Sequence, residues 1–90
     1  MNCLKQTNQD NTFSIFQASN QTYLKYNAEK AEEAILQIYD MNGRLLDERN
    51  LMFMSGVNEI ILNQLDLPQG VFVARLLNSG TVSSNIFTMN

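Results

Sequence analysis

Carboxylates in adjacent pairs are the side chains of this chain best suited to acid–base chemistry. The two pairs are Glu32-Glu33 and Asp47-Glu48, and a pair of carboxylates can supply a general acid and a general base. Neighbouring side chains of an extended strand point to opposite faces, so the two carboxylates of each pair do not converge. We interpret both pairs as solvated surface charge.

The residue types that serve nucleophilic and metal chemistry are almost missing. The chain contains no His, which removes the common general base and a frequent metal ligand. Its single cysteine, Cys3, lies in a polar N-terminal stretch without the electropositive pocket that activates a thiolate, and we interpret it as an unpaired thiol. We therefore expect no catalysis and no cofactor.

Asp40-Met41-Asn42-Gly43 is similar to the start of a calcium-binding loop. The Gly comes too early for such a loop, and no Glu follows at the distance needed to close the site. The segment instead predicts a hairpin turn at Asn42-Gly43, since both residue types tolerate left-handed geometry, with the Asp40 side chain as its cap.

Methionines and tyrosines are the remaining candidates for binding. For the methionines, gap-filling in the core is favoured over a soft binding surface. For the tyrosines, half-buried strand positions are favoured over a sugar-stacking platform, because the chain has no Trp. The residues concerned are Met41, Met52, Met54, Met89, Tyr23, Tyr26 and Tyr39.

Composition excludes several classes of partner. Ninety residues suit one domain with a single thin core. Six basic and nine acidic residues give a net charge of −3, and the basic residues are scattered, so a nucleic-acid partner is not expected. No apolar run approaches the roughly 18 residues of a membrane span, and the first residues do not resemble a signal peptide.

Short apolar runs at regular spacing predict the elements that position these residues. Residues 1–11 are expected to form a flexible lead-in, and residues 12–90 a β domain. Alternation predicts strands over 12–16, 22–26, 34–39, 44–54, 57–62, 71–77 and 81–89. A bend or bulge is expected near residues 48–50, where the alternation falters.

Turn residues separate these runs. All four glycines fall between strands, as expected for turns that need a positive φ, and Pro68 lies in a connection. Polar turns are predicted at Ser19-Asn20 and Asn78-Ser79-Gly80. Residues 27–34 contain good helix formers but are short for a helix, so a loop with at most one helical turn is predicted.

About seven short strands around one core indicate an all-β, immunoglobulin-like antiparallel β-sandwich, with an up-and-down barrel as the rival. The strand over 71–77 is unusual because both of its faces are apolar apart from Arg75. Such a strand is either central and covered on both sides, or it presents an apolar patch to a partner. We favour the patch, and a weak homodimer through an exposed strand is one association it suggests.

Three stretches, in order, carry a family resemblance: 38–46 (IYDMNGRLL), 55–58 (SGVN) and 67–76 (LPQGVFVARL). They resemble the C-terminal sorting domain of the type nine (Por) secretion system, whose pattern is an Ile-Tyr-Asp strand, an Asn-Gly-Arg turn, a Gly-x-Asn strand entry and a Leu-Pro-x-Gly turn. Order and spacing match over about residues 34–88.

The resemblance implies a non-catalytic sorting and anchoring domain of a longer exported protein of Bacteroidetes bacteria. Secretion machinery would recognise it in the periplasm and carry its cargo across the outer membrane to the cell surface or the medium. The alternative is a β-sandwich module of a secreted protein that binds proteins or carbohydrate. The residues implied to shape the recognised surface are Asn42, Gly43, Arg44, Leu67, Pro68, Gly70 and Phe72.

Overall fold

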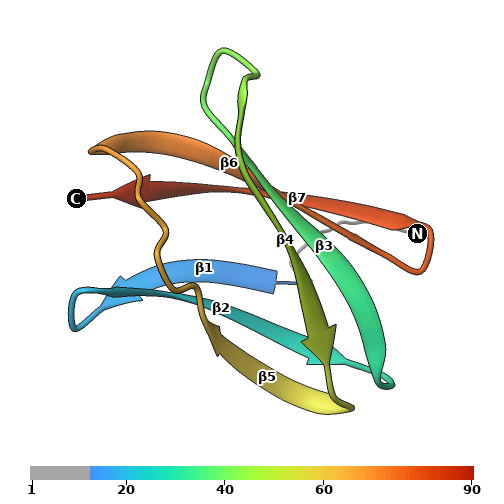
Figure 1. Ribbon diagram of the computed structural model, residues 1–90. Helices are drawn as coiled ribbons and strands as arrows, with labels where there is room; N and C mark the ends of the chain where they lie inside the picture. The colour runs from blue at the N-terminus through green and yellow to red at the C-terminus, as the bar shows by residue number, and fades with distance from the viewer. Residues whose placement is uncertain (1–12) are drawn as a thin grey trace, which may run out of the picture.

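Alternating apolar and polar residues form seven strands in the computed structural model, which describes residues 13–90. The strands are β1 (Phe13–Ala18), β2 (Gln21–Ala28), β3 (Glu32–Tyr39), β4 (Leu45–Phe53), β5 (Gly56–Ile61), β6 (Gly70–Asn78) and β7 (Thr81–Met89). One sheet has the order β1-β2-β5 and the other β4-β3-β6-β7, with every pairing antiparallel (Figure 1). The predicted all-β sandwich of about seven strands is confirmed.

The placement of the fourth strand distinguishes this sandwich from the constant-type immunoglobulin arrangement, which also has one sheet of four strands and one of three. There the fourth strand pairs with the sheet of the first, whereas here β4 pairs with β3. The two sheets approach each other at β1 and β7, where the Asn85 side-chain amide donates to the Phe13 carbonyl. The predicted lead-in, residues 1–11, lies outside the described residues, as does Cys3.

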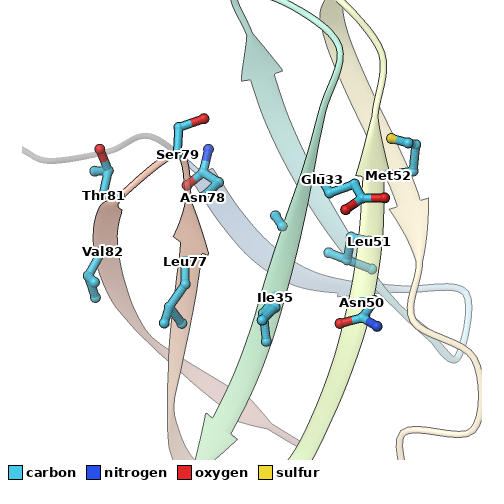
Figure 2. A pocket seen from close by; sticks show the side chains of 12 residues that line it. Glu33, Ile35, Asn50, Leu51, Met52, Leu77, Asn78, Ser79, Thr81 and Val82 are labelled. Atoms are coloured by element: carbon cyan, nitrogen blue, oxygen red, sulfur yellow. The ribbon is translucent and has the colours of Figure 1, made fainter.

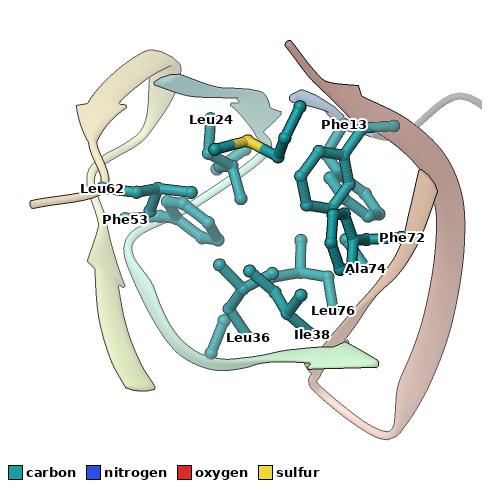
Figure 3. Close-up of a cluster of buried hydrophobic side chains, with 13 residues drawn as sticks. Phe13, Leu24, Leu36, Ile38, Phe53, Leu62, Phe72, Ala74 and Leu76 are labelled. Carbon is teal, nitrogen blue, oxygen red and sulfur yellow. The ribbon is translucent and has the colours of Figure 1, made fainter. Parts of the chain in front are cut away.

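The core lies between the inner faces of the two sheets (Figure 3). Ala34, Leu36 and Ile38 of β3 are buried, as the alternation predicts. Leu24 of the opposite sheet is fully buried. Phe53, the last residue of β4, is also fully buried and lies near Leu24 in Figure 3. Each such large side chain contributes roughly 1.5–3 kcal/mol on leaving water.

Two hairpins have the tight turns that their sequences predict. Ala18 pairs with Gln21 and Asn78 with Thr81, so each turn has two central residues. Both central residues have positive φ: 53° and 65° at Ser19 and Asn20, and 52° and 76° at Ser79 and Gly80. Such turns match the twist of the strands that they connect.

The segment from 27 to 34 differs from the predicted loop. Asn27 and Ala28 continue β2 and pair with Val57 and Gly56, and β3 already begins at Glu32. Only residues 29–31 connect the two strands. Strand pairing and burial of Ala28, which is 3% exposed, outweigh the helix propensity of this short stretch.

The irregularity in β4 was predicted at the wrong place. The strand is continuous through residues 48–50, and its register shifts where Ile38 pairs with Asp47 but Tyr39 pairs with Leu45. Alternation falters near 48–50 for another reason. β4 is an edge strand, and its Asp47 and Arg49 lie opposite the core residues Ile38 and Leu36 of β3. The two charged side chains form an ion pair, with 2.9 Å between Nε of Arg49 and Oδ2 of Asp47. Inward charge at an edge strand discourages pairing with other chains.

β6 is central in its sheet, between β3 and β7. Phe72, Ala74 and Leu76 are buried on its inner face, while Val71 on its outer face is 43% exposed. No described element covers this outer face. The apolar character of both faces therefore has two origins: the inner face belongs to the core, and the outer face is an uncovered surface.

Candidate recognition surface

The β3–β4 connection is a three-residue hairpin loop, Met41-Asn42-Gly43, between Asp40 and Arg44. The Gly43 amide donates to the Asp40 carbonyl and the Asp40 amide to the Arg44 carbonyl, each at 3.0 Å. Gly43 has φ +86°, whereas Asn42 is not among the described residues with positive φ. The loop is thus a turn completed by a left-handed glycine, and the predicted left-handed geometry holds for Gly43 and is wrong for Asn42.

The Asp40 carboxylate caps this loop, as predicted. Its Oδ1 accepts hydrogen bonds from the backbone amides of Asn42 and Arg44, each at 2.9 Å. Its Oδ2 lies 3.2 Å from Nε of Arg44, whose side chain is 77% exposed. The amide of Arg44, followed by that of Asn42 and the guanidinium charge, lowers the pKa of Asp40 below its usual value.

The cap holds the backbone of the loop and leaves the side chains at its tip exposed. Met41, Asn42 and Arg44 are exposed, and the hairpin extends beyond the strands beside it, at the top of Figure 1. An amide, a cation and a thioether in a fixed arrangement suit recognition of another macromolecule rather than a reaction.

The second predicted group, Leu67 to Phe72, leads into β6. Leu67 packs against the core and Pro68 is exposed. Gly70 has φ +148°, and a Cβ built there would lie 3.7 Å from the ring of Phe72. Phe72 is 4% exposed, and its ring lies 5.9 Å from that of Phe87. Phe72 thus supports this turn from within the core and presents no side chain to solvent.

The two groups lie at the same end of the four-stranded sheet without touching. Tyr39 of β3 pairs with Val73 of β6, and the two strands are antiparallel. The hairpin loop comes after Tyr39 and the turn at 67–70 comes before Val73, so both lie at the same end of the sheet. Gly70 pairs with Met89 at that end. Beyond Tyr39 the hairpin extends away from β6 (Figure 1). No hydrogen bond within residues 13–90 joins the hairpin tip to the turn at 67–70. The sheet end therefore carries two separate projections.

The Gly-x-Asn stretch has a structural role. Asn58 accepts a hydrogen bond from the Met54 amide at 2.9 Å. Its own amide donates to the carbonyls of Met54 and Gly56 at 2.8 and 3.0 Å. This one side chain closes the β4–β5 turn, where Gly56 has φ +100°.

A polar cluster that the sequence did not reveal ties the two sheets together. Oε1 of Glu32 accepts from the Ser79 hydroxyl at 2.5 Å, and its Oε2 accepts from the Asn78 amide at 3.2 Å and the Tyr26 hydroxyl at 3.4 Å. These hydrogen bonds, that of Ser79 first, lower the pKa of Glu32. The members come from β2, β3, the end of β6 and the β6–β7 turn, so no local sequence pattern could have indicated the cluster.

The remaining candidate binding residues are dispersed. Tyr23 stacks on Phe16 with ring centroids 5.5 Å apart, Tyr26 packs on Phe53 in the interior, and Tyr39 lies under Arg75. The three tyrosines thus lie on different faces and form no common platform.

The predicted core role of the methionines holds only for Met89, which is 8% exposed. It is wrong for three others, which are 59–65% exposed because they lie in turns or on the outward side of an edge strand. These three are Met41, Met52 and Met54.

Among the described residues, no group of three or more Cys, Asp or Glu is placed to hold a metal ion. Residues 13–90 also contain no helix with the length and apolar character needed to cross a membrane.

Comparison with known proteins gives one match. The family model of the secretion system C-terminal sorting domain matches residues 18–89, which is most of the chain. Searches of curated proteins and of solved structures found no match. Domains of the matched family are sorting signals of type nine secretion and are in general non-catalytic. The chain belongs to the family of secretion system C-terminal sorting domains.

Proposed function

We propose that this domain directs an attached cargo protein across the outer membrane through the type nine secretion system, by way of the periplasm, to the cell surface or the medium. Family membership supports this assignment. In this role the domain is an address without catalytic activity, and its partners are the secretion machinery and the cargo.

The observation that carries the proposal beyond family membership is the β3–β4 hairpin. Two backbone amides of the loop donate hydrogen bonds to the Asp40 carboxylate, while the side chains of Asn42 and Arg44 are exposed to solvent. A loop that is rigid, exposed and not needed for the core is suited to a recognition element. Gly43 gives the loop its shape. At the same sheet end the exposed Pro68 and the left-handed Gly70 form the second projection, which Leu67 and Phe72 support from the core side.

A fusion experiment tests the assignment. The complete 90-residue chain is placed behind a periplasm-directed fluorescent protein in a Bacteroidetes host with type nine secretion. Machinery-dependent fluorescence at the cell surface is expected, and a secretion-null strain should keep the signal in the periplasm. Folded, intact fusion protein trapped in the periplasm of the wild-type host would contradict the proposal.

Substitutions at the hairpin tip test the recognition surface itself. Asn42→Ala and Arg44→Ala should change the free energy of unfolding by no more than about 0.5 kcal/mol, because both side chains are exposed and the Asp40–Arg44 ion pair is solvated. Surface fluorescence should nevertheless fall severalfold. Lys25→Ala is the matched control, since it removes an exposed cation from the other sheet. Equal surface fluorescence for all three variants would show that the hairpin is not part of the recognised surface.

A further inference from the structure

The tip of the β3–β4 hairpin contains Asn42-Gly43, the one place in the sequence where an asparagine precedes a glycine. Asparagine is a chemically labile residue, because its side chain can lose ammonia after attack by the backbone nitrogen that follows it. A glycine leaves the path of that nitrogen open, since it has no Cβ. No atom outside the immediate neighbours lies within 4 Å of a Cβ built on Gly43, so the rest of the protein leaves this pair uncrowded.

Two other asparagines that precede small residues are held in place. Asn27, which precedes an alanine, lies in the paired part of β2. Asn78 lies beside the serine that follows it at the end of β6 (Figure 2), and its amide donates to the Tyr26 hydroxyl at 2.9 Å and to Oε2 of Glu32 at 3.2 Å. The side chain of Asn42 is exposed and makes no hydrogen bond within residues 13–90. Asn42 therefore combines the most permissive neighbour with an unrestrained side chain.

The backbone nitrogen that would react is held by the loop. The Gly43 amide donates to the Asp40 carbonyl at 3.0 Å. The amides on either side of it, those of Asn42 and Arg44, both donate to Oδ1 of Asp40 at 2.9 Å. The Gly43 nitrogen cannot turn toward Cγ of Asn42 while it keeps its own hydrogen bond. The loop must open before the reaction, and the Asp40 cap opposes that opening.

We propose that Asn42 is the first asparagine of this chain to deamidate, and that the Asp40 cap sets the rate by keeping the loop closed. In the open loop the Gly43 nitrogen loses its proton and bonds to Cγ of Asn42. The bond from Cγ to Nδ2 breaks, and Nδ2 leaves as ammonia with that proton, which gives a cyclic imide. Water then opens the imide at either of its carbonyl groups, so that aspartate or isoaspartate stands at position 42.

The reaction changes both the charge and the shape of the hairpin tip. Each product has a carboxylate where Asn42 has a neutral amide, close to the ion pair in which Oδ2 of Asp40 lies 3.2 Å from Nε of Arg44. Isoaspartate also lengthens the main chain by one methylene group, so the bond from the Gly43 amide to the Asp40 carbonyl cannot keep its present geometry. The proposal does not depend on the sorting assignment.

Peptide mapping of the complete chain tests the site. The folded chain is kept in mildly alkaline buffer, digested with trypsin at intervals and analysed by mass spectrometry. The tryptic peptide 31–44 contains Asn42 as its only asparagine, and peptide 76–90 contains Asn78 and Asn85. Peptide 31–44 should be the first to gain the mass of an amide-to-acid conversion and to contain isoaspartate. Asn42→Gln should abolish this conversion, because glutamine forms the larger ring much more slowly. Earlier conversion of any other peptide would overturn the site.

Substitutions at Asp40 test the control of the rate. Asp40→Ala should speed the conversion of peptide 31–44 about fivefold or more, because two hydrogen bonds to a charged acceptor are lost. Asp40→Ser should give an intermediate rate, since a hydroxyl oxygen can still accept from the loop amides. Asp66→Ala is the matched control, because it removes an exposed carboxylate from another loop and should leave the rate unchanged.

Melting curves establish that each variant is folded at the temperature of the incubation, and the wild-type chain in urea gives the rate without a loop. Folded wild type should be the slowest of these samples. If Asp40→Ala is unfolded, the comparison of Asp40→Ser with the wild type decides. Equal rates for the wild type and the folded Asp40 variants would overturn the role of the cap, and equal rates for folded and urea-unfolded wild type would overturn protection by the loop.

Discussion

Single polar side chains determine the shape of the turns at the residue scale. Asp40 and Asn58 each satisfy several backbone groups of one turn, and neither takes part in the core. A turn amide or carbonyl bonded in this way cannot easily adopt another conformation. The Asp-x-Asn-Gly and Gly-x-Asn stretches are therefore explained in this chain by turn geometry.

Gly70→Val tests the turn before β6. Gly70 has φ +148°, and the added side chain would also approach the ring of Phe72. A β-branched residue is strained at such a φ, so the free energy of unfolding should fall by more than about 1 kcal/mol. Chemical denaturation measures this, with Gln69→Val as the neighbouring exposed control. An unchanged midpoint for Gly70→Val would show that the turn tolerates another backbone geometry.

At the scale of elements, the strands are joined at one end by the Glu32 cluster. The carboxylate receives hydrogen bonds from β2, from the end of β6 and from the β6–β7 turn, so ionised Glu32 links the two sheets. The other end of the sheet carries the hairpin and the turn at 67–70, and within residues 13–90 neither of them makes a hydrogen bond to the other sheet. We expect the end of β2 and the start of β3, which meet at Glu32, to be better protected from hydrogen exchange than the hairpin tip.

The cluster predicts a dependence of stability on pH. Its hydrogen bonds hold the pKa of Glu32 below the usual 4.5, so the stabilisation is complete above pH 4.5 and is lost as pH falls through the lower folded-state pKa. Asp40 acts in the same direction below its usual pKa of 3.8. Melting temperatures between pH 7 and pH 3 measure the effect.

Glu32→Gln isolates the contribution of this carboxylate. The variant should be less stable than the wild type at neutral pH, and the difference should narrow toward pH 3, because Gln carries no charge to lose. Glu33→Gln is the control, since Glu33 is exposed on the opposite side of β3. A constant difference between wild type and Glu32→Gln across the whole range would show that ionisation of Glu32 does not stabilise the fold.

At the scale of the whole molecule, stability depends on one thin core between two sheets. A domain of this size has a total stability of roughly 4–12 kcal/mol. Adjacent residues of β3 point to opposite faces of its sheet: Leu36 is buried in the core at 0% exposure, and Ile35 is 39% exposed on the outer face. Substituting each by Ala should therefore have very different effects.

Leu36→Ala should cost about 2–5 kcal/mol, since it leaves a cavity in the core. Ile35→Ala should cost less than about 1 kcal/mol, because its side chain is 39% exposed on the outer face. Urea denaturation provides both values. Similar losses for the two variants would mean that the outer face of the four-stranded sheet is covered.

The sequence by itself determined the elements of this protein, because period-two alternation and turn residues act over a few neighbours. The strand over 81–89, the turns at Ser19-Asn20 and Ser79-Gly80, the Asp40 cap and the buried side of β3 follow from such local rules. The ordered motifs likewise identified the family.

Tertiary structure alone decided which strands are neighbours and what covers each face. Pairing with β5 converted the predicted loop at 27–28 into strand, and the edge position of β4 explains its inward charges. The Glu32 cluster unites residues up to 53 positions apart. The outer face emerges only when β4, β3, β6 and β7 are aligned. These features depend on contacts between distant segments, and the spacing of residues along a chain carries no record of such contacts.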